Sequence, residues 1–183
     1  MLVDQQVSLI KELDNHVMKC VKDQNGNHVI QKAIECVAHE HIQFIFDAFS
    51  GQVGQLAIHS YGCRVIQRIL ERGSPPLKQS IIRELHQCGS TLVSDQFGNY
   101  VTQGVISLGS DKDKESIINL VKANLMAFSR HKYASNVVEK CLTEGTDEQK
   151  HEMMMKVLER TDNRDSNLIS MIKDQYANYV LRM

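Results

Sequence analysis

The residues of this chain that are best suited to chemistry are pairs of side chains four positions apart, which return at a regular interval. Their amide, hydroxyl, thiol and carboxyl groups offer hydrogen bonding rather than covalent catalysis. Residues four apart share one face of an α-helix, so the two members of each pair project together. In chain order the pairs are Asn27/Gln31, Cys63/Gln67, Asn99/Gln103, Ser135/Glu139 and Asn178/Arg182.

A second kind of side chain follows the first member of each pair, turned about 100° around the helix. These side chains are His28, Arg64, Tyr100, Asn136 and Tyr179, and all except Asn136 are flat aromatic or guanidinium groups. Paired amides in a row with flat groups between them suit unpaired bases, which have edges to hydrogen-bond and faces to stack. The alternative interpretation is that these are solvated helix positions and that ladders of Asn tie neighbouring units together.

The spacing of the pairs shows that the chain is built from repeats. Asn27, Cys63, Asn99 and Ser135 are each 36 residues apart, and the step to Asn178 is 43 residues, which indicates one insertion of seven. A period in this range is typical of stacked units that bury their apolar faces against their neighbours. The same interval separates Gly73-Ser74, Gly109-Ser110 and Gly145-Thr146.

These Gly-Ser and Gly-Thr pairs predict the boundary between two helices. Glycine commonly ends a helix, and serine or threonine commonly begins the next. Pro75 suits a first helical position, and Thr146 with Gln149 three residues later predicts a capping box. Each unit is therefore expected to hold three helices. We expect one domain over 1–183, with units at about 15–50, 51–86, 87–122 and 123–160, partial units at 1–14 and 167–183, and a loop insertion at 160–166.

The middle helix of each unit also carries an apolar stripe that we expect to face the core. It comprises Val29-Ile30, Val65-Ile66, Val101-Thr102 and Val137-Val138, and it continues one turn later in each unit. The chain begins and ends inside repeats, so apolar side chains that a further unit would cover are expected to be exposed. These are Val7, Ile10, Ile169, Ile172 and Val180.

Composition agrees with helices throughout, since the 183 residues are 42% hydrophobic and include two Pro and no Trp. The formal charge of −1 argues against a uniformly basic surface but leaves room for a basic stripe. The five cysteines form no C-x-x-C pair and no zinc spacing, which is typical of reduced thiols in an intracellular protein. Without an apolar run of membrane-spanning length, we expect a cytoplasmic protein that does not bind membranes.

No motif predicts an enzyme, a cofactor or a small-molecule substrate. The chain lacks G-x-x-x-x-G-K-[ST], G-x-S-x-G and H-E-x-x-H. His39-Glu40-His41 is interpreted as a solvated helix start rather than a metal site. Met153-Met154-Met155 is interpreted as the core and flank of a third helix.

The repeated stretches closely resemble the motifs of the Pumilio (PUF) family of RNA-binding proteins. Residues 25–32 read Asn-Gly-Asn-His-Val-Ile-Gln-Lys and residues 61–68 read Tyr-Gly-Cys-Arg-Val-Ile-Gln-Arg. Residues 97–103 read Phe-Gly-Asn-Tyr-Val-Thr-Gln and residues 133–140 read Tyr-Ala-Ser-Asn-Val-Val-Glu-Lys. The resemblance implies an all-α fold, a curved right-handed superhelical solenoid of three-helix, armadillo-like repeats. It implies a partial Pumilio homology domain with repeats four to seven, the tail of the third and the start of the eighth.

The resemblance also implies that the concave face binds single-stranded RNA, one base per repeat, with the strand antiparallel to the protein. An Asn/Gln pair can accept from uracil N3–H and donate to the uracil carbonyls, so Asn27/Gln31 and Asn99/Gln103 are each expected to select U. The pair Cys63/Gln67 is expected to select A, with Gln67 bonding the edge of the base while Cys63 packs against the ring. The pair Ser135/Glu139 is expected to select G, because Glu139 can accept from guanine N1–H and N2–H₂, with Ser135 assisting.

These assignments agree with the recognition code of the family and give 5′-UGUAU-3′, with the eighth repeat taking the first U. Arg182 departs from the Gln that is usual at its position. The resemblance implies binding to mRNA 3′ untranslated regions, leading to repression or decay through deadenylation and translational-control partners on the outer face. The competing hypothesis is a helical scaffold that binds proteins, which would not need the paired residues in register.

Overall fold

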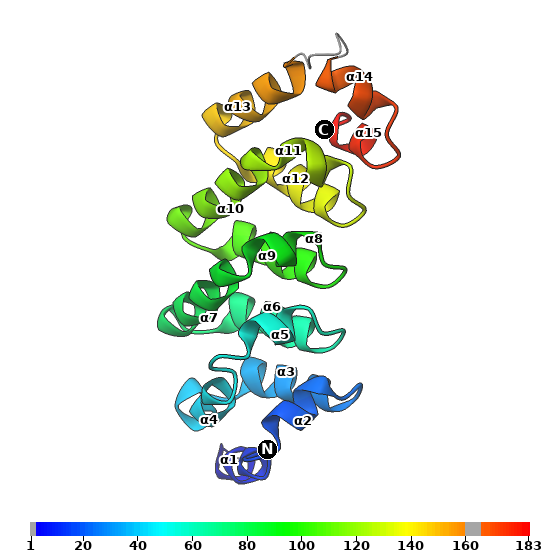
Figure 1. The fold of residues 1–183 in the computed structure, drawn as a ribbon. Helices are drawn as coiled ribbons and strands as arrows, with labels where there is room; N and C mark the ends of the chain where they lie inside the picture. The colour runs from blue at the N-terminus through cyan, green and yellow to red at the C-terminus, as the bar shows by residue number, and fades with distance from the viewer. Residues whose placement is uncertain (1–2, 160–165) are drawn as a thin grey trace. The chain divides into compact units, whose positions relative to one another are not determined.

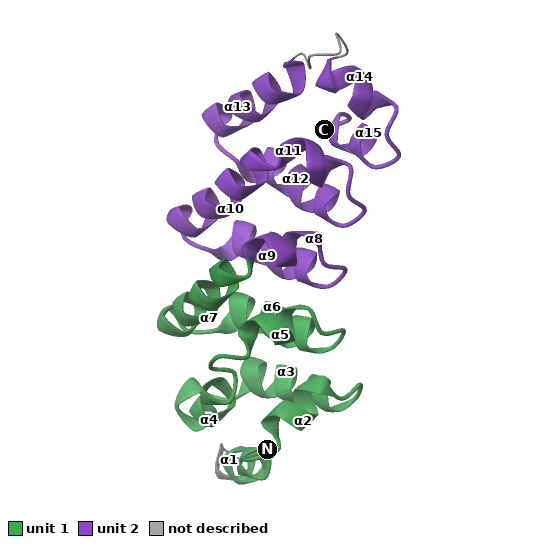
Figure 2. Cartoon of the chain, viewed as in Figure 1, with its two compact units in different colours: residues 1–88 green, residues 89–183 purple. Residues whose placement is uncertain are grey.

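The structure is a computed structural model that describes residues 3–159 and 166–183. All regular elements in these residues are helical, and they fall into two compact units, residues 1–88 and residues 89–183 (Figure 2). The prediction of an all-α helical-repeat fold is therefore confirmed. Among the described helices, none has both the length and the apolar character needed to cross a bilayer.

Unit 1 holds two complete repeats behind one preceding helix, as Figure 1 shows. The preceding helix is α1 (Val3–Lys11). The first repeat contains α2 (Val17–Lys22), α3 (Gly26–Cys36), the short 3₁₀ helix η1 (His39–His41) and α4 (Gln43–Asp47). The second repeat contains α5 (Val53–Ala57), α6 (Gly62–Arg72) and α7 (Pro75–Gln87).

Unit 2 continues the same order of short, middle and third helices (Figure 1). Its first repeat contains α8 (Gly89–Ser94), α9 (Gly98–Leu108) and α10 (Asp111–Ala123). The next contains α11 (Leu125–Ser129), α12 (Ala134–Glu144) and α13 (Asp147–Leu158). The last described elements are α14 (Asn167–Ile172) and α15 (Ala177–Val180). Most of the insertion predicted at 160–166 lies outside the described residues, and Ser166 caps α14 by accepting from the Ile169 N–H at 3.3 Å.

The middle helices pack against one another and form the spine of each unit. In unit 1 α3 packs on α6, and in unit 2 α9 packs on α12 and α12 on α15. Side-chain bridges connect neighbouring repeats at the ends of these helices. Arg68 on α6 pairs with Glu35 on α3 at 3.1 Å, and the Ser107 hydroxyl on α9 donates to Glu144 on α12 at 2.8 Å. The middle helices are thereby held side by side.

The predicted apolar stripe lies in the core, except that Val29 is 50% exposed and Leu142, one turn later in its repeat, is half-buried. Val65, Val101 and Val137 are fully buried. The expectation of exposed terminal residues was also wrong in part. Ile169 and Ile172 are exposed, but Ile10 and Val180 are buried, the latter on α15 where that helix packs against α12. Val7 is half-buried.

The helix boundaries fall where the Gly-Ser and Gly-Thr pairs predict them, but the glycines act differently from the expectation. Gly73, Gly109 and Gly145 have φ of −63°, −75° and −69°, which any residue can adopt. A Cβ at Gly109 would instead lie 2.6 Å from the Val105 carbonyl oxygen, with the same close approach at the other two positions. Glycine is needed here for proximity to the preceding turn.

Three local predictions can be compared directly with the structure. The capping box of Thr146 and Gln149 is confirmed, and Pro75 is the first residue of α7. Met153 is buried while Met154 and Met155 are exposed, which confirms the core-and-flank interpretation. His39-Glu40-His41 does not start a helix that continues into the third helix. It forms the separate 3₁₀ helix η1, in which the His39 ring contacts Phe46 edge-on.

Candidate nucleic-acid interface

Every middle helix is entered through a tight turn that is held by a side chain. The Asp23 carboxylate accepts from the backbone N–H groups of Asn25 and Gly26 at 2.9 and 2.7 Å. Asp95 and Asp174 cap their turns in the same way, with distances of 2.7–2.9 Å. These backbone hydrogen bonds hold the pKa of the Asp23 and Asp174 carboxyls below their ordinary values. The turn fixes the start of each middle helix.

Two of the turns use histidine in place of aspartate. His59 Nδ1 accepts from the N–H groups of Tyr61 and Gly62, both at 3.2 Å. His131 Nδ1 accepts from the N–H groups of Tyr133 and Ala134 at 3.2 and 3.3 Å. These turn residues were missed in the sequence, although they recur at the same interval, four positions before the first member of each pair.

The paired asparagines connect this turn to the helix. Asn27 Nδ2 donates to the carbonyl oxygens of Asp23 and Gln24, both at 2.9 Å. Asn99 repeats the arrangement with Asp95 and Gln96 at 2.9 and 3.0 Å. The two asparagines are 1% and 0% exposed. Both amide hydrogens of each asparagine are used within its own repeat. The asparagines therefore do not form a ladder between neighbouring repeats, and the alternative interpretation that they do is wrong.

The second member of each amide pair is oriented by the first. Gln31 Nε2 donates to Asn27 Oδ1 at 2.8 Å, and Gln103 Nε2 donates to Asn99 Oδ1 at 3.1 Å. This leaves each glutamine with its carbonyl oxygen and one N–H. The structure brings the predicted pairs together, but it assigns the free donor and acceptor to the glutamine. The asparagine holds the glutamine in position.

The pairs without asparagine have a looser connection to the turn. Cys63 is buried, and its sulfur lies 3.6 Å from the Ser60 carbonyl oxygen. Ser135 is also buried, and its hydroxyl donates to the Lys132 carbonyl at 3.4 Å. Their partners, Gln67 and Glu139, are half-buried. Burial raises the pKa of the Glu139 carboxyl above its ordinary value.

The second-position side chains lie on the surface, as a stacking role requires. All five are exposed, and Tyr100 and Tyr179 are each 55% exposed despite their size. In unit 2 the second and fifth positions of neighbouring repeats open on one concavity of about 370 Å³. Its lining residues are Tyr100, Gln103, Asn136, Glu139, Lys140, Thr143 and Met183. Flat and hydrogen-bonding groups therefore meet in one open pocket.

The last predicted pair is not assembled in this way. Asn178 Nδ2 donates to the Asp174 carbonyl at 2.8 Å, as in the other asparagine units. The helix α15 ends at Val180, however, so Arg182 does not share a helical face with Asn178. The Arg182 guanidinium lies 5.0 Å from the centroid of the Tyr179 ring.

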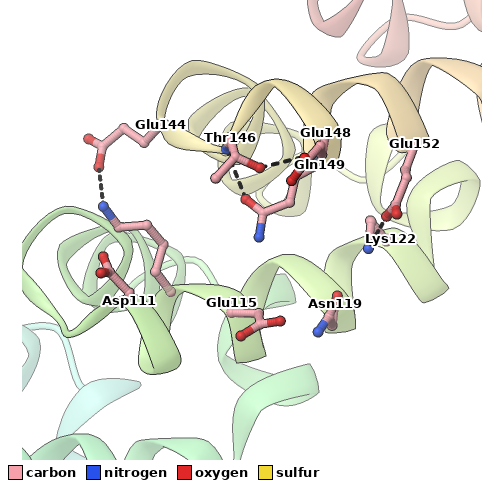
Figure 3. Close-up of a pocket in the computed structure, with 10 residues that line it drawn as sticks. Asp111, Glu115, Asn119, Lys122, Glu144, Thr146, Glu148, Gln149 and Glu152 are labelled. Carbon is pink, nitrogen blue, oxygen red and sulfur yellow. Dashed lines mark hydrogen bonds and ion pairs between the residues drawn. The ribbon is translucent and has the colours of Figure 1, made fainter.

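A second cleft, of about 520 Å³, lies between α10 and α13 in unit 2, away from the paired positions (Figure 3). Lys114 pairs with Glu144 at 3.9 Å, and Lys122 pairs with Glu152. Figure 3 shows Glu115 and Asn119 on the wall opposite Thr146 and Gln149, whose mutual hydrogen bonds form the capping box. Among the described residues, no group of three or more His, Cys, Asp or Glu side chains could hold a metal ion.

The repeat units match a known family along most of the chain. The Pumilio-family RNA-binding repeat matches residues 16–49, 52–86, 90–121, 124–158 and 167–181. The chain belongs to the Pumilio family. It is 34% identical over 179 residues to the Pumilio domain-containing protein C6G9.14 of Schizosaccharomyces pombe, covering 98% of this chain and 26% of that protein. It therefore spans about a quarter of that relative's length.

Solved structures of Pumilio-family domains agree closely with this fold. The Puf3 RNA-binding domain bound to a Cox17 RNA 3′ UTR recognition sequence has a TM-score of 0.92 and 44% identity, covering 100% of this chain and 57% of that one. PUF-8 in complex with PBE-RNA has a TM-score of 0.92 and 38% identity, covering 98% and 53%. Both relatives were solved with RNA bound.

Proposed function

We propose that this chain binds single-stranded RNA of the sequence 5′-UGUAU-3′, with each middle helix reading one base. The observation that carries the proposal is the repeated geometry of a capped turn, a buried first residue, an exposed second residue and a half-buried fifth residue. Base edges can meet the fifth residue while base faces stack on the second. The RNA-bound relatives support the same ligand class.

Uracil is assigned to the two Asn/Gln units. Since Asn27 and Asn99 hold one N–H of Gln31 and Gln103, the glutamine carbonyl oxygen is free to accept from uracil N3–H. The remaining glutamine N–H can donate to a uracil carbonyl. Cytosine has no N3–H donor, so the same geometry disfavours it.

Adenine is assigned to the repeat with Cys63 and Gln67, and guanine to the repeat with Ser135 and Glu139. Gln67 bonds the adenine edge, and the small, buried Cys63 leaves room for the purine ring. The ionised Glu139 accepts from guanine N1–H and N2–H₂, a pair of adjacent donors that no other base offers. Ser135 lies one helical turn away on the same face.

The order of the units sets the order of the bases. Unit 1 carries the readers of U and A, and unit 2 carries the readers of U and G together with Asn178. An antiparallel strand then reads 5′-UGUAU-3′, with Asn178 and Tyr179 meeting the first U. We propose that such elements lie in mRNA 3′ untranslated regions and that binding leads to repression or decay in the cytoplasm, through deadenylase and translational-repressor partners.

Selection of RNA ligands from a random pool by the purified chain tests the proposal. Enrichment of UGUAU is the expected result, followed by competition binding at one fixed salt concentration because phosphate contacts depend on salt. Enrichment of unrelated sequences would refute the base assignments. Failure to retain any RNA would favour the alternative of a helical scaffold for protein partners.

A further inference from the structure

The turns that hold the base-reading helices differ in the group that caps them, and the difference follows the predicted base. Aspartate caps the turn in the three repeats whose first paired residue is asparagine. Histidine caps the turn in the repeats that contain Cys63 and Ser135. We propose that His59 and His131 are positioning residues that make the reading of adenine and guanine sensitive to pH, while the reading of uracil is not. This inference rests on the proposed RNA function.

The chemistry of the cap differs between the two residues. An imidazole nitrogen accepts a hydrogen bond only while it carries no proton. His59 Nδ1 accepts from two backbone N–H groups, so the ring must be neutral with its hydrogen on Nε2. A second proton would place an N–H on Nδ1 opposite two other N–H groups, and the cap would be lost. Imidazole is the side chain that ordinarily gains this proton between pH 5 and 8.

The aspartate turns keep their caps over the same range. Hydrogen bonds from backbone N–H groups hold the pKa of Asp23 and Asp174 below the ordinary carboxyl value. Acidification from pH 8 to pH 5.5 therefore leaves these carboxylates ionised. The histidine caps differ, because a proton on Nδ1 removes the acceptor.

Loss of the cap affects the paired residues because the cap holds the turn from which the middle helix starts. The backbone N–H of Cys63 donates to the His59 carbonyl at 3.0 Å, and Ser135 does the same with His131 at 3.0 Å. The Cys63 thiol and the Ser135 hydroxyl contact turn carbonyls at 3.6 and 3.4 Å. Asn27 and Asn99 instead add two amide bonds each, at 2.9–3.0 Å. The first residue and its helix start are therefore less well fixed without the histidine cap.

Charged and titratable groups lie on the elements that pack around the two turns. In unit 1 α2, α3 and α6 pack together, and in unit 2 α12 contacts α8 and α15 while α11 contacts α14. The groups near the turn ends of these elements are Lys19, Lys22, Asp23, His28 and Arg64 for His59, and Asp95, Arg130, Lys132, Lys173 and Asp174 for His131. Tyr61 and Tyr133 contact the two imidazole rings.

The adenine unit gives the clearest test, because Gln67 does not titrate whereas Glu139 does. Fluorescence anisotropy with the full chain would compare 5′-UGUAU-3′ with 5′-UGUUU-3′ at pH 8.0 and pH 5.5 and one salt concentration. We expect the preference for A to fall about 3- to 10-fold on acidification, the equivalent of one weakened hydrogen bond. His59→Asp is expected to keep its preference at both pH values, since aspartate caps the equivalent turns of this chain.

A reciprocal variant supplies the control. Asp95→His is expected to give the central uracil a weaker pH dependence than adenine has in the parent, because Asn99 keeps its two amide bonds to the turn. The comparison uses 5′-UGUAU-3′ against 5′-UGCAU-3′. Equal preference for A at both pH values in the parent would overturn the inference, and so would an unchanged pH dependence in His59→Asp. Absence of any preference for A at pH 8.0 would instead refute the proposed function, so the two failures are distinguishable.

Discussion

At the scale of single residues, the two members of each amide pair have different hydrogen-bonding roles. Asn27 and Asn99 are buried and donate both amide hydrogens to turn carbonyls, while Gln31 and Gln103 keep a free acceptor and a free donor. An asparagine at this position therefore has an effect even before a base arrives, because it fixes the orientation of the glutamine. We therefore expect base specificity to depend on this arrangement as well as on the types of the two residues.

The most direct test of the pairs is to exchange one for another. Ser135→Asn with Glu139→Gln installs the amide pair of the uracil units and removes the carboxylate that matches guanine. The double variant is expected to prefer 5′-UUUAU-3′ over 5′-UGUAU-3′, the reverse of the parent. Each bidentate contact contributes about 1–3 kcal/mol by analogy with base readout in DNA.

Competition binding at pH 8 and fixed salt measures the reversal. The matched control is Asn99→Ser with Gln103→Glu, which is expected to make the central position prefer G. If the parent and both variants discriminate these RNAs equally, the pairs are only a polar helix face.

The pH dependence of guanine recognition is a second residue-scale prediction. Burial raises the pKa of Glu139, and guanine requires the ionised form. Affinity for G is therefore complete above that raised pKa and declines as pH falls through it, approaching about tenfold per pH unit. The decline is expected at higher pH than for an exposed glutamate.

Titration of binding in the His59→Asp/His131→Asp background isolates this effect from both turn histidines. Glu139→Gln in the same background is the control, and its affinity for 5′-UGUAU-3′ is expected to be flat over the same range. A pH profile shared by both proteins would show that the carboxylate is not the titrating group.

For the exposed second positions we predict a loss of affinity without a change of base preference. Tyr100 is 55% exposed beside Gln103 and Asn136 in the open concavity of unit 2. Tyr100→Ala is expected to weaken binding of 5′-UGUAU-3′ and its single-base variants alike, by about 1–3 kcal/mol, because stacking does not depend on base identity. Anisotropy with four RNAs that differ at the central base checks this. A change of preference without loss of affinity would exclude a stacking role for Tyr100.

At the scale of the element, the sequence predicts the helices well because their signals are local. The repeat interval, the apolar stripe and the Thr146–Gln149 capping box each involve residues close in the chain, and the structure agrees with them. The turn caps of His59 and His131 and the close approach at Gly109 depend on backbone geometry, which residue types alone do not specify. Likewise, the burial of Val180 depends on packing against α12.

The serines at two helix starts offer a matched stability test. Ser110 accepts from the Asp113 N–H at 3.3 Å, and Asp113 accepts from the Ser110 N–H at 3.1 Å, forming a capping box at α10. Ser74, at the equivalent position of α7, makes no side-chain cap hydrogen bond. Ser110→Ala is expected to lower the free energy of unfolding by about 0.5–2 kcal/mol. Ser74→Ala is expected to change it by less than about 0.5 kcal/mol.

Urea denaturation followed by circular dichroism measures both variants. Equal losses for Ser74→Ala and Ser110→Ala would mean that the side-chain cap at α10 contributes nothing. A larger loss for Ser74→Ala would contradict the hydrogen bonding at both helix starts.

At the scale of the whole molecule, stability is expected to vary along the solenoid, since each repeat is completed by its neighbours. In unit 2 the helix α12 packs along the spine against both α9 and α15, whereas α14 has six residues and α15 four. Helices this short form only with tertiary support. Ile169 and Ile172 are exposed on α14. An apolar groove of about 600 Å³ also adjoins α15, lined by Met153, Val157, Val180, Leu181 and Met183 among others.

Hydrogen exchange of the free chain therefore has a predicted order within unit 2. Amides of α14 and α15 are expected to exchange faster than those of α9 and α12, because they open locally without unfolding of the spine. Saturating 5′-UGUAU-3′ is expected to slow exchange in α15, since Asn178 and Tyr179 are assigned to the first uracil and a ligand that binds only the folded form stabilises it. The control RNA 5′-GUAU-3′ lacks that base and is expected to protect α12 but not α15. Uniform exchange across unit 2 in a monomeric sample would contradict the local-opening argument, and equal protection of α15 by both RNAs would remove the eighth-repeat assignment.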